Sequence, residues 1–173
     1  MEFTFQTTID RKAMTGMAKG LRKTIRRKHS RRSHVFGVVV VIAGLLLTIL
    51  GENGIEINVR SAVTWLAMLA IVAALIWEDQ LNGYFAGKKM LPGMEQDETC
   101  FGEEGYRTVT GLGETSWHYD NIDQIARLDN YYVFVYSKNH AQVYDRRTIS
   151  GGTEEEFEKF LTEKTGKTIQ VIK

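Results

Sequence analysis

Two apolar runs dominate the hydrophobic pattern of this chain. Residues 35–50 and residues 62–77 hold sixteen residues each without a charged side chain, and eleven residues separate them. At about 1.5 Å per residue, each run forms a helix of roughly 24 Å, slightly shorter than a hydrocarbon core of about 30 Å. Both runs are apolar on every face, so neither helix has a polar face that would lie in water. The pattern predicts a transmembrane helical hairpin over residues 35–77.

Two other interpretations of these runs fit the sequence less well. One apolar helix of this length would also suit a buried core, but a soluble domain of this size does not need two of them. A cleaved secretory signal is excluded because the first run begins after 34 residues and lacks a small-residue cleavage site.

The segment before the hairpin, residues 1–34, carries two patterns in turn. In residues 1–9, Phe3 and Phe5 alternate with polar neighbours, which is typical of a strand. In residues 11–32, apolar side chains recur at helical spacing and Lys and Arg cover the other faces. The sequence leaves open whether this basic amphipathic helix runs straight into the hairpin or bends. It also leaves open whether the N-terminal strand joins a later sheet.

After a predicted linker at residues 78–97, residues 98–173 alternate short strand patterns with turn residues. Thr153 and Glu156 form the sequence signature of a capping box, and Gly166 supplies a stop, so a helix is expected between them. The expected strands cover residues 98–101, 106–110, 114–118, 122–129, 131–137, 141–145 and 168–172.

This order of elements, an antiparallel meander finished by one helix, predicts a small β-barrel of the pleckstrin-homology-like type. The chain resembles the YcxB-like family of small bacterial membrane proteins. The segments that carry the resemblance are CFGEEGYRTV, TSWHYDNIDQIARLDNYYVFVYSKNHAQVYDRRTI and TEEEFEKFLTEKTG. The resemblance covers nearly the whole chain, and it implies a pleckstrin-homology-like domain on a membrane anchor with no established general activity. The expected fold class is therefore membrane α+β.

The distribution of charge predicts how the hairpin is oriented. Residues 1–34 hold ten Lys/Arg and two acids, whereas residues 78–173 hold seventeen acids and eleven Lys/Arg. The segment between the runs, residues 51–61, has Arg60 as its single basic residue. By the positive-inside rule, both termini lie in the cytoplasm and residues 51–61 lie outside. We expect a multi-pass protein of the bacterial cytoplasmic membrane.

The basic clusters are the candidate binding residues. Next to a bilayer, each basic residue attracts anionic headgroups by about 1 kcal/mol. Docking on the acidic remainder of the chain is a second interpretation. Binding to nucleic acid is not expected, because no DNA-reading motif accompanies the charge. The residues proposed for binding a lipid or a partner are Arg26, Arg27, Lys28, Arg31, Arg32, Arg146 and Arg147.

No motif of catalysis or metal binding is present in the sequence. Cys100 is the single cysteine, which excludes an intramolecular disulfide and a cysteine metal cluster. No paired metal-ligand spacing or phosphate-binding glycine loop occurs, so no metal site and no cofactor are expected. His118 and Asp120 could serve an enzyme acting on a lipid headgroup, but a histidine at a strand end is the simpler interpretation.

The sequence therefore predicts a non-enzymatic, membrane-anchored binding or regulatory module with no catalytic residues. Its expected partners are anionic lipid headgroups and a protein, either a membrane complex or a toxin, and the sequence leaves homo-oligomers open. The alternative is an immunity protein that neutralises a secreted or membrane-inserting toxin, with residues 51–61 or the hairpin making the contact.

Overall fold

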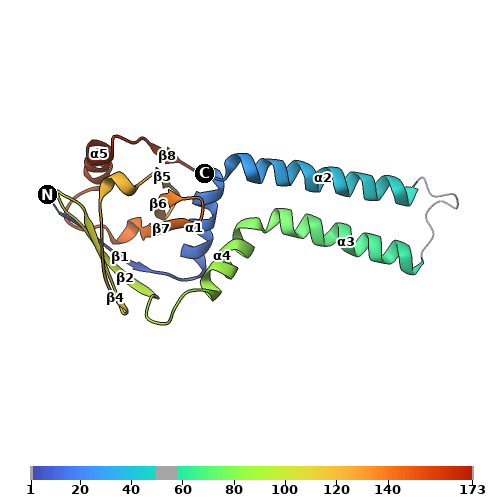
Figure 1. Ribbon diagram of the computed structural model, residues 1–173, viewed down its shortest axis with the longest axis horizontal. Helices are drawn as coiled ribbons and strands as arrows, with labels where there is room; N and C mark the ends of the chain where they lie inside the picture. Colours follow the sequence, from blue (N-terminus) through green and yellow to red (C-terminus); the bar gives the residue numbers. More distant parts are fainter. Residues whose placement is uncertain (1, 50–57, 173) are drawn as a thin grey trace.

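A β-sheet domain with two long helices projecting from one side makes up the computed structural model (Figure 1). It describes residues 2–49 and 58–172, so most of the predicted outer segment, residues 51–57, lies outside the described residues. The helices are α1 (Arg11–Lys23), α2 (Arg27–Ile49), α3 (Val59–Ile76), α4 (Glu78–Lys88) and α5 (Glu154–Thr165), with short 3-10 turns η1 (Tyr119–Asn121) and η2 (Arg146–Thr148). The strands are β1 (Phe3–Thr8), β2 (Gln96–Phe101), β3 (Tyr106–Thr110), β4 (Gly113–Trp117), β5 (Gln124–Arg127), β6 (Tyr131–Ser137), β7 (His140–Asp145) and β8 (Ile169–Val171).

The N-terminal strand is part of the domain. β1 pairs antiparallel with β2, with Phe5 opposite Thr99, and opens a four-stranded sheet of order β1-β2-β3-β4. This answers the question that the sequence left open. The helices α1, α2, α3 and α4 all lie in the connection between these two neighbouring strands. The segment that contains these four helices is therefore attached at both ends to the same sheet.

The second sheet has the order β7-β6-β5-β8, in which β8 is parallel to β5 and the other pairs are antiparallel. The prediction of one closed barrel is wrong, because the described strands form two separate sheets. Where β1 approaches the end of β7, a single bridge joins Thr4 and Ser150. Two hydrogen bonds accompany it, from the Asp145 amide to Thr7 Oγ1 at 3.2 Å and from the Gln6 amide to Thr148 Oγ1 at 3.1 Å. The turn η2 follows β7 directly, and no continuous ladder of backbone hydrogen bonds joins β1 to β7 among the described strands.

Two apolar layers hold the domain together. Aromatic side chains fill the space between the sheets and α5, and α1 covers the outer face of the second sheet. A Cβ on Gly20 of α1 would lie 2.8 Å from a methyl carbon of Val133, so the helix packs tightly on β6. β6 is thus buried on both faces, which confirms the expectation from its aromatic and β-branched sequence.

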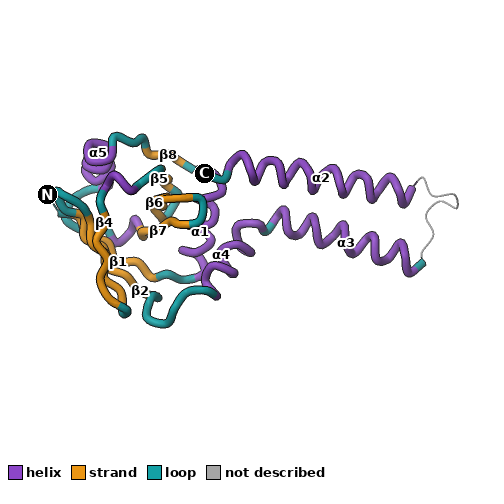
Figure 2. The backbone as a smooth tube through the Cα atoms, viewed as in Figure 1, coloured by secondary structure: helices purple, strands orange, loops and turns teal. Residues whose placement is uncertain are grey.

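The projecting helices α2 and α3 are long and apolar enough, by length and composition, to cross a membrane. They lie side by side (Figure 2) and approach closely at Gly37 and Gly44, where added Cβ atoms would meet Leu75 and Met68 at 2.9 and 2.8 Å. Most of their apolar side chains are exposed. Nothing within the described chain therefore covers this surface.

Two boundaries differ from the expectation. The helical pattern covers residues 11–32 in the sequence, but α1 ends at Lys23 and α2 begins at Arg27. At the break, Thr24 leaves the helical conformation, with φ −102° and ψ −103°. Residues 78–97 were predicted as a linker, but α4 occupies residues 78–88 and packs against α1.

Candidate functional site

The junction between the domain and the projecting helices carries a network of ion pairs. The guanidinium of Arg22 on α1 donates two hydrogen bonds to Asp79 on α4, from Nε to Oδ1 and from Nη2 to Oδ2, each at 2.6 Å. Glu78 lies 3.8 Å away from the same Nε. The bond to Asp79 raises the pKa of Arg22, although partial burial acts against it. This bidentate pair fixes α4 to α1.

A second set of contacts joins α2 to the same point. Ser30 on α2 is buried and donates from Oγ to Glu78 Oε2 at 3.0 Å. His34, one turn further along α2, brings Nδ1 to within 3.6 Å of the same oxygen. Since Glu78 begins α4, these contacts fasten the base of α2 to the end of α3. The two projecting helices therefore leave the domain at one cluster of polar contacts.

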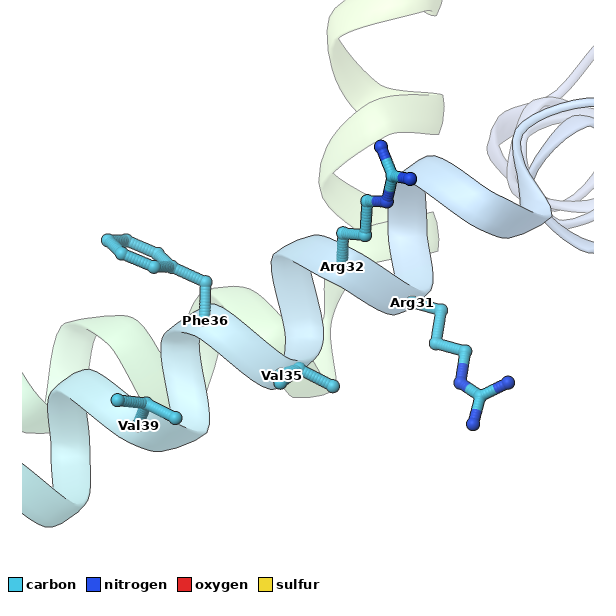
Figure 3. Close-up of a pocket in the computed structure, with 5 residues that line it drawn as sticks. All are labelled: Arg31, Arg32, Val35, Phe36 and Val39. Atoms are coloured by element: carbon cyan, nitrogen blue, oxygen red, sulfur yellow. The ribbon is translucent and has the colours of Figure 1, made fainter.

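Four of the predicted binding residues form an exposed basic surface at the base of α2. Arg27, Lys28, Arg31 and Arg32 are all exposed, and no ion-pair partner is present for them within residues 2–49 and 58–172. Figure 3 shows Arg31 and Arg32 pointing in different directions, with apolar residues following along the same helix. Arg31, Arg32, Val35, Phe36 and Val39 line one shallow hollow. Cationic and apolar side chains thus meet within about two turns of helix.

Arg26 belongs to the domain rather than to this basic surface. Its Nε donates to the Lys138 carbonyl at 2.6 Å, and its Nη2 donates to Asn139 Oδ1 at 2.9 Å. The guanidinium therefore ties the start of α2 to the β6–β7 turn.

Arg146 and Arg147, the other predicted patch, are also held by the domain. Arg146 donates to the carbonyls of Leu128 and Asp129, each at 2.9 Å, pairs with Glu154 and lies over the ring of Tyr132. Arg147 is exposed but forms a bidentate pair with Asp145, with bonds of 2.9 and 2.6 Å. That pair holds the pKa of Asp145 below its ordinary value. These cations are engaged in internal contacts, unlike those on α2.

The residues considered for enzymatic chemistry are not assembled. His118 and Asp120 are both exposed, on either side of the buried Tyr119, and no hydrogen bond joins them in the described part of the chain. Cys100 is half-buried on β2. Among the described residues, no group of three or more His, Cys, Asp or Glu is placed to hold a metal ion. The absence of enzymatic activity stays a prediction.

A polar network between the sheets was missed from the sequence. Tyr136 and Tyr144 both donate to Gln142 Oε1 at 2.5 Å, and the Tyr136 hydroxyl also contacts that of Tyr106 at 2.5 Å. Asp97 is buried nearby, and its Oδ1 has no hydrogen-bond partner. Burial raises the pKa of Asp97 to about 6, although hydrogen bonds with Thr7 act against this shift. The alternation along β2 could have predicted the burial of Asp97, because Asp97 lies on the same face of the strand as Phe101.

This buried carboxyl should make stability depend on pH. The folded chain keeps the Asp97 proton up to about pH 6, whereas an unfolded aspartate loses it near pH 4, so stability falls as pH rises between these values. Asp97→Asn should therefore raise the free energy of unfolding by about 1–3 kcal/mol at pH 8 and leave it unchanged below about pH 4.

Thermal unfolding in mild detergent at both pH values measures the effect of Asp97→Asn, with Glu98→Gln on the exposed face of the same strand as the matched control. An equal gain at both pH values, or a loss at pH 8, would show that the buried charge is not the cause.

One comparison with known proteins, that with family models, agrees with the sequence resemblance. Residues 101–161 match the family described as YcxB-like protein. The solved "Structure of the Spt16D Pob3N heterodimer" is similar at 11% sequence identity and a TM-score of 0.31, over 43% of this chain and 44% of that chain. The likeness thus spans less than half of that chain's length, and no curated protein matches the sequence. The family predicted from the sequence is confirmed over one segment: residues 101–161 of this chain are YcxB-like.

Proposed function

We propose that this chain is a non-enzymatic binding module anchored in the bacterial cytoplasmic membrane. In this proposal α2 and α3 span the bilayer as a hairpin, both termini are cytoplasmic, and the domain is a pleckstrin-homology-like module that holds a partner at the membrane surface. Two packed sheets with a C-terminal helix against their core support the domain assignment. The exposed apolar surface of α2 and α3 supports the anchor.

The observation that carries the proposal is the sharp boundary on α2 between cations and apolar side chains. Arg31 and Arg32 are exposed and have no ion-pair partner among the described residues, and one turn later Phe36 begins an exposed apolar surface. A helix crossing a membrane places cations at the headgroups and apolar side chains among the acyl chains. We infer that anionic lipid headgroups bind here.

Neutralising this surface should release anionic lipid. Each basic residue near the surface contributes about 1 kcal/mol, so Arg31→Gln/Arg32→Gln should weaken binding by about 2 kcal/mol, or roughly thirtyfold. The measurement is the ratio of anionic to neutral lipid that copurifies with the full chain in mild detergent, read by mass spectrometry.

The matched control is Lys159→Gln/Lys167→Gln, which removes the same charge from the α5 side of the domain, where Lys159 is exposed and Lys167 half-buried. Unchanged lipid retention in the α2 variant, or an equal loss in the control, would contradict a specific headgroup site.

A protein partner is proposed for the opposite side of the domain. β4 is an edge strand of the first sheet, and every residue from Gly113 to Ser116 is exposed. An exposed strand edge can accept a further strand from another chain. The immunity hypothesis, with contacts made by residues 51–61 or by the hairpin, stays a prediction from the sequence. Residues 51–57 lie outside the described residues.

A further inference from the structure

The helix α4 is held by the domain along one side. A Cβ on Gly83 would lie 2.8 Å from the Thr15 amide nitrogen and 2.9 Å from the carbonyl carbon of Met14, so α4 rests on the backbone of α1. One turn earlier, Asp79 is bound to Arg22. This side of α4 therefore cannot turn away from the domain without breaking both contacts.

The other side of α4 is apolar and exposed. Trp77, Leu81 and Phe85 are 54%, 41% and 58% exposed, and their spacing of four residues places them on one face. This face continues the exposed apolar surface of α3, because Trp77 is the single residue between the two helices. Figure 2 shows α4 leaving α3 at an angle, on the side of the domain from which the hairpin projects.

Cations and an aromatic ring border this apolar face. Two basic groups lie close to the ring of Tyr84, with Arg11 Cζ 5.5 Å and Lys88 Nζ 4.8 Å from its centre. Aromatic side chains are enriched at membrane–water interfaces, and long basic side chains reach from there to the phosphates. The mixture matches an anionic bilayer surface better than a dry protein interface, from which lysine is depleted.

We propose that α4 lies in the cytoplasmic face of the bilayer, with Trp77, Leu81 and Phe85 among the upper acyl chains. This inference rests on the proposed function, because it takes α3 to be membrane-spanning. The inference adds that the domain contacts the bilayer through α4 and is not attached to it through α2 and α3 alone. With α4 in the interface on one side and the basic surface of α2 on the other, the domain is docked at a fixed angle to the membrane.

Fluorescence quenching by lipids with brominated acyl chains tests the depth of α4. The full chain is reconstituted in vesicles of phosphatidylcholine and phosphatidylglycerol, after its three tryptophans are replaced by phenylalanine. Phe85→Trp then reports on α4, and Leu81→Trp is a second probe if the first variant does not fold. Leu112→Trp, at a site 56% exposed between β3 and β4, is the matched control. A further variant that keeps Trp65 alone reports on α3.

The expected result is that Phe85→Trp loses most of its fluorescence when bromine is near the headgroup end of the chains, and less when it is near the methyl end. Leu112→Trp should keep its fluorescence. If Trp65 is quenched while Phe85→Trp and Leu81→Trp behave like Leu112→Trp, α4 does not contact lipid. The inference about α4 is then wrong, although the proposed membrane-spanning hairpin still stands. Coverage of this face by a protein would give that result. If Trp65 is not quenched, the membrane-spanning hairpin fails as well.

Discussion

Phe157→Ala is expected to lower the free energy of unfolding of the domain by about 3–5 kcal/mol. The side chain is fully buried on α5, and its ring centre lies 4.7 Å from that of Phe5 and 5.1 Å from that of Phe101. It also contacts the ring of Tyr132 in the second sheet, at 5.5 Å. One side chain therefore joins both sheets to the helix, and its loss leaves a cavity that rigid aromatic neighbours cannot fill.

Denaturant unfolding of the full chain in mild detergent, followed by near-ultraviolet circular dichroism, measures the effect of Phe157→Ala. Lys159→Ala on the exposed face of the same helix is the control and should change stability by less than about 0.5 kcal/mol. Equal midpoints for the two variants would mean that α5 does not close the core between the sheets.

Gly83→Ala is expected to separate α4 from α1 and to destabilise their contact by about 1–3 kcal/mol. The new Cβ would meet backbone atoms of Met14 and Thr15 at 2.9 and 2.8 Å, and backbone cannot move aside as a side chain can. The same substitution at Gly87, one turn later, would place its Cβ 3.8 Å from the Met14 side chain, an ordinary contact. Gly87→Ala should therefore be neutral or stabilising by up to about 1 kcal/mol.

Hydrogen exchange of the α1 and α4 amides in detergent measures this pair of variants. Faster exchange in Gly83→Ala than in Gly87→Ala is the predicted order. The reverse order, or equal rates, would show that the two helices are not held at backbone contact.

Local signals were sufficient to predict several elements. The capping box of Thr153 and Glu156 is present on α5, with the Glu156 amide donating to Thr153 Oγ1 at 3.2 Å. Gly166 ends that helix in the left-handed region, at φ +64°. The two apolar runs lie on helices α2 and α3, which begin eight and three residues before the runs do. In each case the sequence within one or two turns specifies the element.

The helix α4 could not be predicted because its pattern is inverted. The side that packs on the domain presents Gly83, whereas Leu81 and Phe85 are exposed. Periodicity assigns apolar residues to the protein interior, so a helix with an apolar exposed face looks irregular in the sequence. The partner that explains this face lies, on our proposal, outside the chain.

Long-range pairing also limited what the sequence could say about the candidate site. Arg146 and the α2 cations look alike in the sequence, yet Arg146 is bound to carbonyls eighteen and seventeen residues earlier and to Glu154. Arg26 is held by a turn more than a hundred residues away. Only the packed sheets show which cations are engaged and which are exposed.

We propose that α2 and α3 cross the membrane and leave the domain in the cytoplasm. The most direct test is labelling of intact bacterial cells with a membrane-impermeant maleimide, after the single native cysteine is removed by Cys100→Ser. Val59→Cys reports on the start of α3, and Ser116→Cys reports on the exposed strand β4. Val59→Cys is expected to be labelled in intact cells, and Ser116→Cys is expected to be labelled only after the membrane is opened. Labelling of Ser116→Cys in intact cells, or protection of Val59→Cys until the membrane is opened, would contradict this proposal.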